Sequence, residues 1–396
     1  MLHNARLSSR CGRCASEMPH SMTPAAALIA RLRRIACVAM GLLACAGHGF
    51  AQPPDSGPSL PMVPFAMESG DATYRLRVVG GAGGFSQYVQ HEAPFWSQRL
   101  ERLSGGRFRA EIVPYDRAGV PSMQMLRLIE LGVVPMGTLH MSALGSEYPQ
   151  YMAPDLPGLN PDMASLRNHV AAFRPYLEKA LLERHGIRVL AIYAYPAQVL
   201  FCKRPVARLS DLKGRRTRVS SPDMAYFVQA LGGVPVHKNI EQLVDSLEVN
   251  GTECAITGTM SGHTLGLYRV TRYLYPMPLS WALSVFATHE GTWNHLPQAL
   301  RSLLEREIPV LEQRIWEEAQ RETAEGIACN RGLRECSRPG KASMAVMAVT
   351  PEDERLRQQV LDTVVLPQWR ERCLVDCQAL WQQTIAPVLR LRTGAP

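Results

Sequence analysis

The sequence predicts an α/β protein of two lobes, with mixed sheets, strands that cross between the lobes and one long bridging helix. Strand-like and helix-like segments alternate from Tyr74 to Tyr195. The alternation begins again at Phe201, which indicates a second layered unit. A helical pattern at residues 297–328 would measure about 45 Å, longer than one small domain. The 396 residues leave room for two or three domains.

In the first unit, alternation of apolar and polar residues predicts strands at 74–79, 108–112, 136–141 and 187–195. Helices are expected at 86–103, 121–131 and 166–185. Ser86 is a suitable helix cap, and Gly105 and Gly186 stop two of these helices.

The second unit is predicted to contain strands at 216–219, 234–236 and 253–256, followed by crossing strands at 271–275 and 282–288. Pro222 opens a helix that ends at Gly232, and a helix at 240–249 ends at Asn250, which tolerates a left-handed turn. The long helix shows one apolar face at three- and four-residue spacing. Pro309 lies inside it and is expected to kink it.

Composition is that of a globular chain, with 46% hydrophobic and 20% charged residues, and it excludes a disordered protein. The formal net charge of +8 is uneven, because residues 1–51 hold six arginines and one acidic residue. The rest carries only +3 and shows no basic stripe, so the sequence argues against a nucleic-acid partner.

The N-terminal 51 residues are typical of an export signal. Arg31, Arg33 and Arg34 precede an apolar stretch at 35–46, and small residues lead to an expected cleavage after Ala51. Residues 42–45 also approximate a lipoprotein box, which would acylate Cys45. A start at Met22 instead of Met1 would give a signal of ordinary length. Residues 52–72, rich in Pro, Gly and Ser, are expected to be a flexible linker.

Export favours disulfides among the cysteines that follow the leader. These are Cys202, Cys254, Cys329, Cys336, Cys373 and Cys377. Six cysteines allow fifteen connectivities, and a short loop makes Cys329–Cys336 the preferred pair. Cys373 and Cys377 are expected on one helix, where a bond between them needs local distortion. A zinc site from the C-terminal four is the alternative, although the spacing fits no zinc template.

Arg218 is the strongest candidate for ligand binding from position alone. It ends the short strand 216–219, and Ser220 follows at the edge where open α/β sheets bind ligands. A guanidinium there suits a carboxylate, which it can hold through two parallel hydrogen bonds. The alternative is a surface arginine or a structural ion pair.

Other motifs carry little chemistry. Gly81, Gly83 and Ser86 approximate a dinucleotide loop but lack the third glycine and the acidic residue that follows it. No metalloprotease or serine-hydrolase motif occurs, and no nucleophile, base and orienting group can be assembled. We therefore expect no enzyme activity, no cofactor and no metal.

The order of several segments resembles the dicarboxylate-binding (DctP-type) solute-binding subunits of tripartite ATP-independent periplasmic (TRAP) transporters. The resemblance covers most of residues 74–330 and is strongest at Asp211-Leu212-Lys213-Gly214 with Arg218, followed by Ala230-Leu231-Gly232-Gly233-Val234-Pro235-Val236. Shorter matches are Ser104–Arg107, Asp155–Leu159 and Lys203–Val206.

The resemblance implies that Arg218 grips the substrate carboxylate. It places Gln198 where many members have a second arginine, and Thr257 where an asparagine often contacts the ligand. These departures mean that a C4-dicarboxylate cannot be assumed. Ser220, Ser86 and His140 complete the expected binding set.

The family fold implies lobe I at 73–197 with 283–310, and lobe II at 198–282 with 311–396, closing over a ligand between them. The implied function is capture of a small organic acid in the periplasm by a monomer and its delivery to a TRAP membrane permease. Two alternatives remain: a module that presents its ligand to a sensor or receptor, and an exported enzyme.

Overall fold

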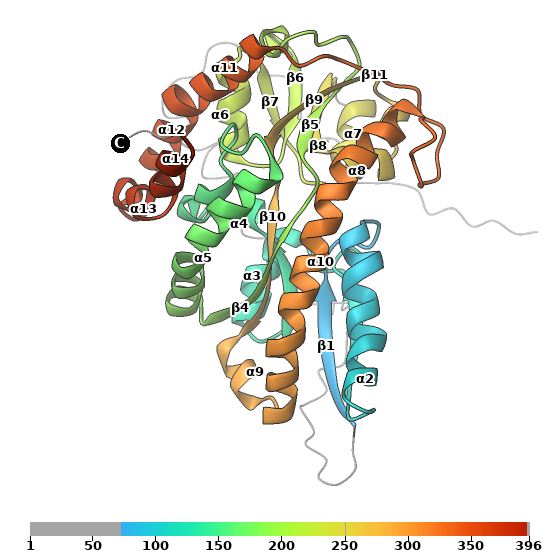
Figure 1. Ribbon diagram of the computed structural model, residues 1–396, viewed down its shortest axis with the longest axis vertical. Helices are drawn as coiled ribbons and strands as arrows, with labels where there is room; N and C mark the ends of the chain where they lie inside the picture. Colours follow the sequence, from blue (N-terminus) through green and yellow to red (C-terminus); the bar gives the residue numbers. More distant parts are fainter. Residues whose placement is uncertain (1–72, 250, 394–396) are drawn as a thin grey trace, which may run out of the picture. The chain divides into compact units, whose positions relative to one another are not determined.

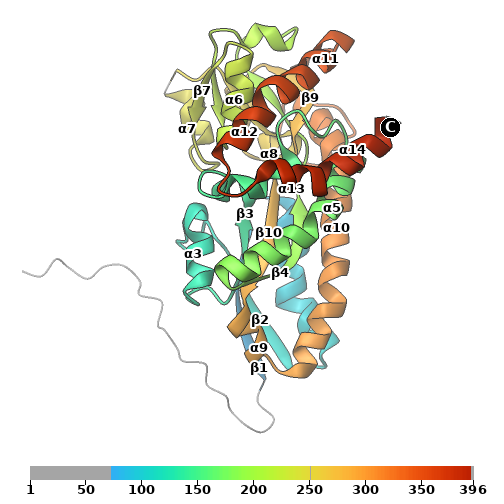
Figure 2. The ribbon, with the colours of Figure 1, turned by 90° about the vertical axis from the view of Figure 1, so that its left-hand side faces the viewer.

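The computed structural model describes residues 73–249 and 251–393, shown in two views in Figures 1 and 2. The predicted export signal, the cleavage after Ala51, the lipoprotein box at Cys45 and the linker at 52–72 lie outside the described residues. So does Asn250. Within the described part of the chain, no helix combines the length and apolarity needed to cross a bilayer.

The first sheet has five strands in the order β2-β1-β3-β10-β4. Their bounds are β1 Tyr74–Gly80, β2 Phe108–Pro114, β3 Met136–His140, β4 Ile187–Ala194 and β10 Leu283–His289. The strands β1, β2 and β3 run parallel, and β10 runs antiparallel to β3 and β4. The four strands predicted in the first unit are therefore present, and the later crossing strand β10 lies among them.

The second sheet has six strands in the order β11-β9-β5-β8-β6-β7. Their bounds are β5 Gln198–Cys202, β6 Arg216–Val219, β7 Val234–His237, β8 Cys254–Gly258, β9 Tyr273–Ser280 and β11 Ala345–Val346. The strands β6, β7 and β8 are parallel, whereas β5 is antiparallel to both β8 and β9. The sheets are mixed, as predicted, because β10 in the first sheet and β5 in the second run against the parallel strands beside them.

Two short connections carry the chain between the sheets. Residues 195–197 lead from β4 to β5, and residues 281–282 lead from β9 back to β10. The connections lie side by side, because the Tyr195 backbone N–H donates to the Ala282 carbonyl at 3.1 Å. These crossings were predicted from the sequence, and they are the natural hinge of a two-lobed protein.

Helices of the first unit cover its sheet. They are η1 Gln87–Glu92, η2 Phe95–Arg99, α2 Leu100–Leu103, η3 Ser122–Gln124, α3 Met125–Glu130, α4 Met141–Leu144, η4 Pro149–Asp155 and α5 Met163–His185. The predicted helix at 86–103 is present as η1, η2 and α2, which include wide helical turns. The helix α5 starts earlier than predicted, since Asp162 caps it by accepting from the Ser165 backbone N–H at 2.7 Å.

Helices of the second unit are η5 Leu209–Leu212, α6 Pro222–Ala230, α7 Leu243–Glu248, α8 Thr259–Thr264 and η6 Leu267–Arg269. After β10 come α9 Glu290–His295 and the long helix α10 Gln298–Arg331. Trp316 of α10 donates to the Ile192 carbonyl of β4 at 2.7 Å, and Thr259 of α8 donates to the Glu322 carbonyl at 3.1 Å. The helix α10 thus contacts both units, as predicted, and Figure 1 shows it extending from α9 past α8.

The C-terminal helices are α11 Pro351–Val360, η7 Leu361–Val365, α12 Leu366–Arg372, α13 Cys377–Gln383 and α14 Ile385–Thr393. Trp369 is fully buried, and its indole N–H donates to the Pro149 carbonyl of η4 at 2.6 Å. Asp353 accepts from the Leu209 backbone N–H of η5 at 2.8 Å. These helices therefore pack on elements of both units, which ties the C-terminus to each.

Three disulfides join the six cysteines: Cys202–Cys254, Cys329–Cys336 and Cys373–Cys377. The prediction of one helix carrying Cys373 and Cys377 is wrong. The helix α12 ends at Arg372 because the Cys373 backbone is extended, and α13 starts at Cys377 with Asp376 as its cap. The break between the helices lets the two sulfurs meet.

Candidate functional site

The directions of the strands bring the candidate ligand-binding residues to one edge of each of the two sheets. The carboxyl ends of β1, β2, β3 and β4 share one edge of the first sheet, because the first three are parallel and β10 is antiparallel to β3 and β4. In the second sheet the carboxyl ends of β6, β7 and β8 share an edge with the start of β5. The short connections at 195–197 and 281–282 leave these two edges, so the edges enclose the cleft between the units.

Arg218 lies at the second of these edges and is 2% exposed. Its Nε donates to the Lys238 carbonyl at 2.8 Å, and its Nη1 donates to the Ile256 carbonyl at 2.9 Å. Arg216, two residues earlier on the same strand, is exposed. Arg218 therefore contacts the residue that directly follows β7 and the backbone of β8, while Arg216 is exposed to water.

The charge of Arg218 has no carboxylate partner within salt-bridge distance in the described part of the chain. Burial lowers the pKa of its guanidinium to about 10, and the negative charge of Glu241 acts in the opposite direction. The group stays protonated at neutral pH with only neutral carbonyl groups as hydrogen-bond acceptors. A buried cation of this kind gains free energy from an anion that enters the cleft.

A cavity of about 470 Å³, which includes space open to solvent, is lined by Ile256, whose carbonyl accepts from Arg218; the Arg218 side chain itself is not among the residues that line it. Ser220 and Gln198 line this cavity too, and so do Ser142 and Asp155. Two of the residues predicted from the sequence therefore meet here, from β5 and from the end of β6.

Gln198 has a structural role within this cavity. Its amide Nε2 donates to the Pro196 carbonyl at 2.9 Å and to the Trp281 carbonyl at 3.3 Å. One side chain thus joins the two connections that cross between the sheets. The amide nitrogen is engaged with the backbone, so Gln198 does not replace the charge of a second arginine.

Thr257 lies in β8 beside Ile256 and is 2% exposed. It is paired across the sheet with Val199 of β5, one residue from Gln198. The structure thus places Thr257 at the same sheet edge as Arg218. Its side chain is not among those that line the same cavity as Ile256.

His140 ends β3 and sits between two tyrosines that sequence reasoning missed. Its ring centroid is 5.6 Å from that of Tyr115 and 5.4 Å from that of Tyr195. Burial lowers the pKa of His140 to about 4, so the imidazole is neutral. The Nε2 atom of His140 is buried without a hydrogen-bond partner among the described residues. Tyr115 directly follows the observed strand β2 and Tyr195 directly follows β4, and a position at a strand end is the signal that could have found them.

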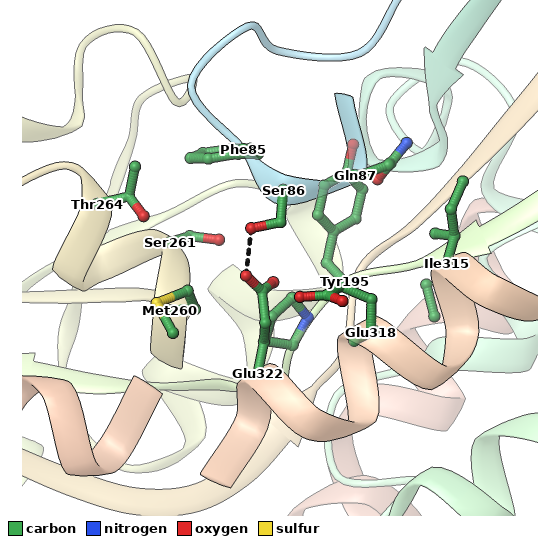
Figure 3. Close-up of a pocket in the computed structure, with 13 residues that line it drawn as sticks. Phe85, Ser86, Gln87, Tyr195, Met260, Ser261, Thr264, Ile315, Glu318 and Glu322 are labelled. Carbon is green, nitrogen blue, oxygen red and sulfur yellow. Dashed lines mark hydrogen bonds between the residues drawn. The ribbon is translucent and has the colours of Figure 1, made fainter. Parts of the chain in front are cut away.

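Ser86 lies apart from the cavity that Ile256 lines, in a second cavity of about 330 Å³ that Figure 3 shows. Its hydroxyl donates to a carboxylate oxygen of Glu322 on α10 and accepts from Arg338 at 2.9 Å. The hydroxyl is therefore already used within the protein. The structure does not bring Ser86 together with Arg218, Ser220 and Gln198.

The glycine-rich loop after β1 is shaped by close packing. A Cβ at Gly80 would approach the Tyr88 ring at 2.7 Å and the Glu92 carboxylate at 2.9 Å. The Gly81 backbone N–H donates to Glu92 at 2.7 Å, and Thr138 donates to the other carboxylate oxygen at 2.6 Å. Burial raises the pKa of Glu92 to about 7, which means that keeping this carboxylate charged costs free energy. Its hydrogen bonds join the loop at Gly81 to Thr138 of β3. The loop needs its glycines for this contact.

One set of potential metal ligands occurs among the described residues. Donor atoms of His263, Cys329 and Cys336 lie within 4.8 Å of one another. The two sulfurs are joined in a disulfide, so they offer no thiolate. The donor set does not fit a metal centre in this state.

The fold and the cleft define a two-lobed solute-binding protein, in which a small molecule enters between two α/β units. The sequence pattern of bacterial extracellular solute-binding proteins, family 7, matches residues 84–365. The chain belongs to this family. Its members are solute-binding proteins and not enzymes.

Solved structures share the fold at low sequence identity. A Bordetella pertussis extracytoplasmic solute receptor binding pyroglutamic acid is 21% identical, with a TM-score of 0.68, over 79% of this chain and 99% of that chain. A TRAP periplasmic solute-binding protein from Desulfovibrio salexigens with bound orotic acid is 16% identical, with a TM-score of 0.69, over 80% and 99%. One from Shewanella oneidensis with bound succinate is 17% identical, with a TM-score of 0.64, over 76% and 95%.

Proposed function

We propose that this protein captures a small organic acid in the periplasm and delivers it to a TRAP-type membrane permease. The observation that carries the proposal is Arg218, a buried guanidinium at the cleft edge with neutral carbonyls as its only hydrogen-bond acceptors in the described chain. The carboxylate of the ligand supplies the missing negative charge. Relatives of the same fold hold pyroglutamate, orotate and succinate, which share a carboxylate and little else.

The remaining residues divide by what they contact. Ser220 lines the cavity that Ile256 also lines, and it is exposed, so we assign its hydroxyl to the ligand. His140 contributes a neutral ring and Thr257 a hydroxyl at the cleft edges. Gln198 and Ser86 act through the hinge and through α10, and these roles replace the ligand contacts that the sequence predicts for them.

We propose that each of the two sheets is the centre of one lobe. Residues 73–197 with 283–310 form lobe I, and residues 198–282 with 311–396 form lobe II. The exchange of strands at residues 195–197 and 281–282 supports these boundaries. The leader at residues 1–51 supports export, and a monomer is the simplest state that leaves the cleft free to open.

Isothermal titration calorimetry with pyroglutamate, orotate and succinate tests the proposal. Arg218→Ala should weaken binding of the acid that the wild type prefers by about 1.5–3 kcal/mol, since a charged hydrogen-bonding partner is lost. Arg218→Lys should also lose affinity, because a point charge does not reproduce the planar fork.

Arg216→Ala is the matched control, since Arg216 lies on the same strand but is exposed. Its affinity should stay within twofold of the wild type. Equal affinities for Arg218→Ala and the wild type would remove Arg218 from the site.

A further inference from the structure

A short loop after α10, residues 332–344, forms a strap on the second unit. The Cys329–Cys336 disulfide closes its base, and the Met344 backbone N–H donates to the Asn330 carbonyl at 2.9 Å. His263 of α8 hydrogen-bonds to the Pro339 carbonyl at 3.0 Å. Figure 1 shows the strap leaving the end of α10 and returning to β11. The strap is therefore anchored to lobe II on several sides.

One side chain of the strap reaches the first unit. Arg338 Nη2 donates to the Ser86 hydroxyl at 2.9 Å, directly before helix η1. With its amide oriented to satisfy both groups, the Gln90 oxygen accepts from Arg338 Nη1 at 2.6 Å and from Nη2 at 2.7 Å. Both partners belong to the first helical segment of lobe I.

The same guanidinium holds two buried carboxylates of α10. Arg338 Nη2 lies 3.0 Å from Glu322 and 3.5 Å from Glu318, whose side chains are only 7% and 4% exposed. Ser86 donates to Glu322, and Figure 3 shows this contact between the start of η1 and α10. Arg338, Ser86 and Glu322 thus form a closed hydrogen-bonded triangle made from the strap, lobe I and the bridging helix.

Because Glu318 and Glu322 are buried, removing the charge of Arg338 is expected to cost more free energy than removing an exposed charge. A carboxylate that loses its charged partner in a buried place bears the cost of desolvation without compensation. Glu322 has the Ser86 hydroxyl as its other side-chain donor. In the proposed lobes Ser86 belongs to lobe I, whereas Glu318 and Glu322 belong to the part of α10 after residue 310, which is assigned to lobe II. The contacts therefore favour the arrangement in which η1 lies against α10.

We propose that Arg338, presented by the disulfide-closed strap, is a latch that holds lobe I against α10 and so positions the loop after β1 at the ligand cleft. This role rests on the proposed binding function, because η1 directly follows the loop at residues 81–86 at the cleft edge. Arg338 is a positioning residue, and it acts on the ligand only through the wall that it holds.

Two variants test the latch, each with a matched control. Arg338→Gln removes the charge at the latch. Its control is Arg321→Gln, because Arg321 pairs with the same Glu318 from the solvent side, is 60% exposed and pairs with no other acidic group in the described chain. Cys329→Ser with Cys336→Ser frees the strap, and Cys373→Ser with Cys377→Ser is the control for loss of a short disulfide.

The first readout needs no ligand. Amide hydrogen exchange of residues 86–92 should become at least tenfold faster in Arg338→Gln and in the strap disulfide variant, and stay within twofold in both controls. Arg338→Lys should recover part of the protection because it restores the charge but not the fork. Unchanged exchange in Arg338→Gln would overturn the latch, even if the disulfide variant failed to fold.

The second readout uses pyroglutamate, followed by stopped-flow tryptophan fluorescence. The latch predicts that dissociation becomes about tenfold faster in Arg338→Gln while association changes less than twofold, because the latch stabilises the closed arrangement from which the ligand dissociates. An equal acceleration in Arg321→Gln would overturn the latch. If the wild type binds none of the three acids, the proposed ligand class fails while the exchange experiment still decides the latch.

Discussion

Arg218, Glu92 and Asp155 each hold an ionisable group that the fold removes from water near the cleft. Arg218 faces neutral carbonyls, whereas the two carboxylates bind backbone N–H groups. Asp155 accepts from the backbone N–H of Trp281 at 3.0 Å and of Ala282 at 2.8 Å, and burial raises its pKa to about 7. Ala282 adopts a φ of 61°, and it is the one non-glycine residue in the described chain with a positive φ. Asp155 therefore fixes a strained turn at the point where the chain crosses between lobes.

Glu92 gives a pH-dependent prediction at the residue scale. Its pKa is about 7 in the folded chain and near 4.5 when it is exposed, so the folded state binds its proton more tightly. The stability that this proton contributes is complete below about pH 4.5 and is lost as the pH rises through about 7.

Urea unfolding of the wild type and of Glu92→Gln, from pH 4.5 to pH 8, measures this effect. The wild type should lose stability relative to Glu92→Gln across this interval, by a difference of the order of 3 kcal/mol at most. A constant difference between the two proteins over the whole range would show that Glu92 does not titrate there.

At the scale of elements, the paired strands β5 and β8 are stabilised by side-chain hydrogen bonds at one end and by a disulfide at the other. At the cleft end Gln198 pairs with Gly258, and its side chain joins the two crossing connections. At the far end Cys202 and Cys254 pair directly and form a disulfide. The five-residue strand places that disulfide about 13 Å from the cleft edge, so it stabilises the sheet without touching the ligand.

Removing this disulfide should lower stability and spare binding. The bond closes a separation of 52 residues, and its loss in Cys202→Ala with Cys254→Ala should reduce the free energy of unfolding by about 2–4 kcal/mol. Urea denaturation of both proteins measures the change. Calorimetry at a temperature where both are folded should give affinities within twofold of each other; a large loss of affinity would contradict the assignment of this bond to the sheet alone.

On the scale of the whole molecule, ligand binding and stability are linked. The lobes share α10 and the two crossing connections, so a ligand held at the facing edges stabilises both units together. A ligand present at 100 times its Kd adds about 2.7 kcal/mol to the free energy of unfolding. Thermal denaturation should therefore identify the ligand among pyroglutamate, orotate, succinate and other organic acids as the one that raises Tm by several degrees.

The same screen with Arg218→Ala distinguishes specific binding from general salt effects. The increase in Tm for the preferred acid should largely disappear in this variant and persist in Arg216→Ala. An equal increase in all three proteins would show that the acid binds elsewhere.

Most of the fold could be predicted locally. Period-two alternation marked all four strands of the first unit, and the three- and four-residue spacing marked α10. Prediction failed where a tertiary contact decides the backbone. Cys373 and Cys377 are four residues apart, which suggested one helix, but the extended backbone at Cys373 and the cap at Asp376 separate α12 from α13.

The candidate site was predictable only in part, because side-chain partners come from distant segments. Arg218 was predicted because strand ends bind ligands in α/β sheets, and its contact with a ligand stays a prediction. Ser86 and Gln198 were predicted to contact the ligand, but Glu322 and Arg338 occupy the Ser86 hydroxyl, and two backbone carbonyls occupy the Gln198 amide. Nothing in the local pattern shows that a hydroxyl 236 residues before Glu322 will meet it.

The sequence by itself determined the alternation of strands and helices, the two crossing strands and the arginine at the end of β6, because each follows from periodicity and chain direction over a few residues. The tertiary structure decided which polar groups remain available to a ligand. That choice depends on hydrogen bonds between segments far apart in the chain. A buried polar group that already binds a partner within the protein is not available to a ligand.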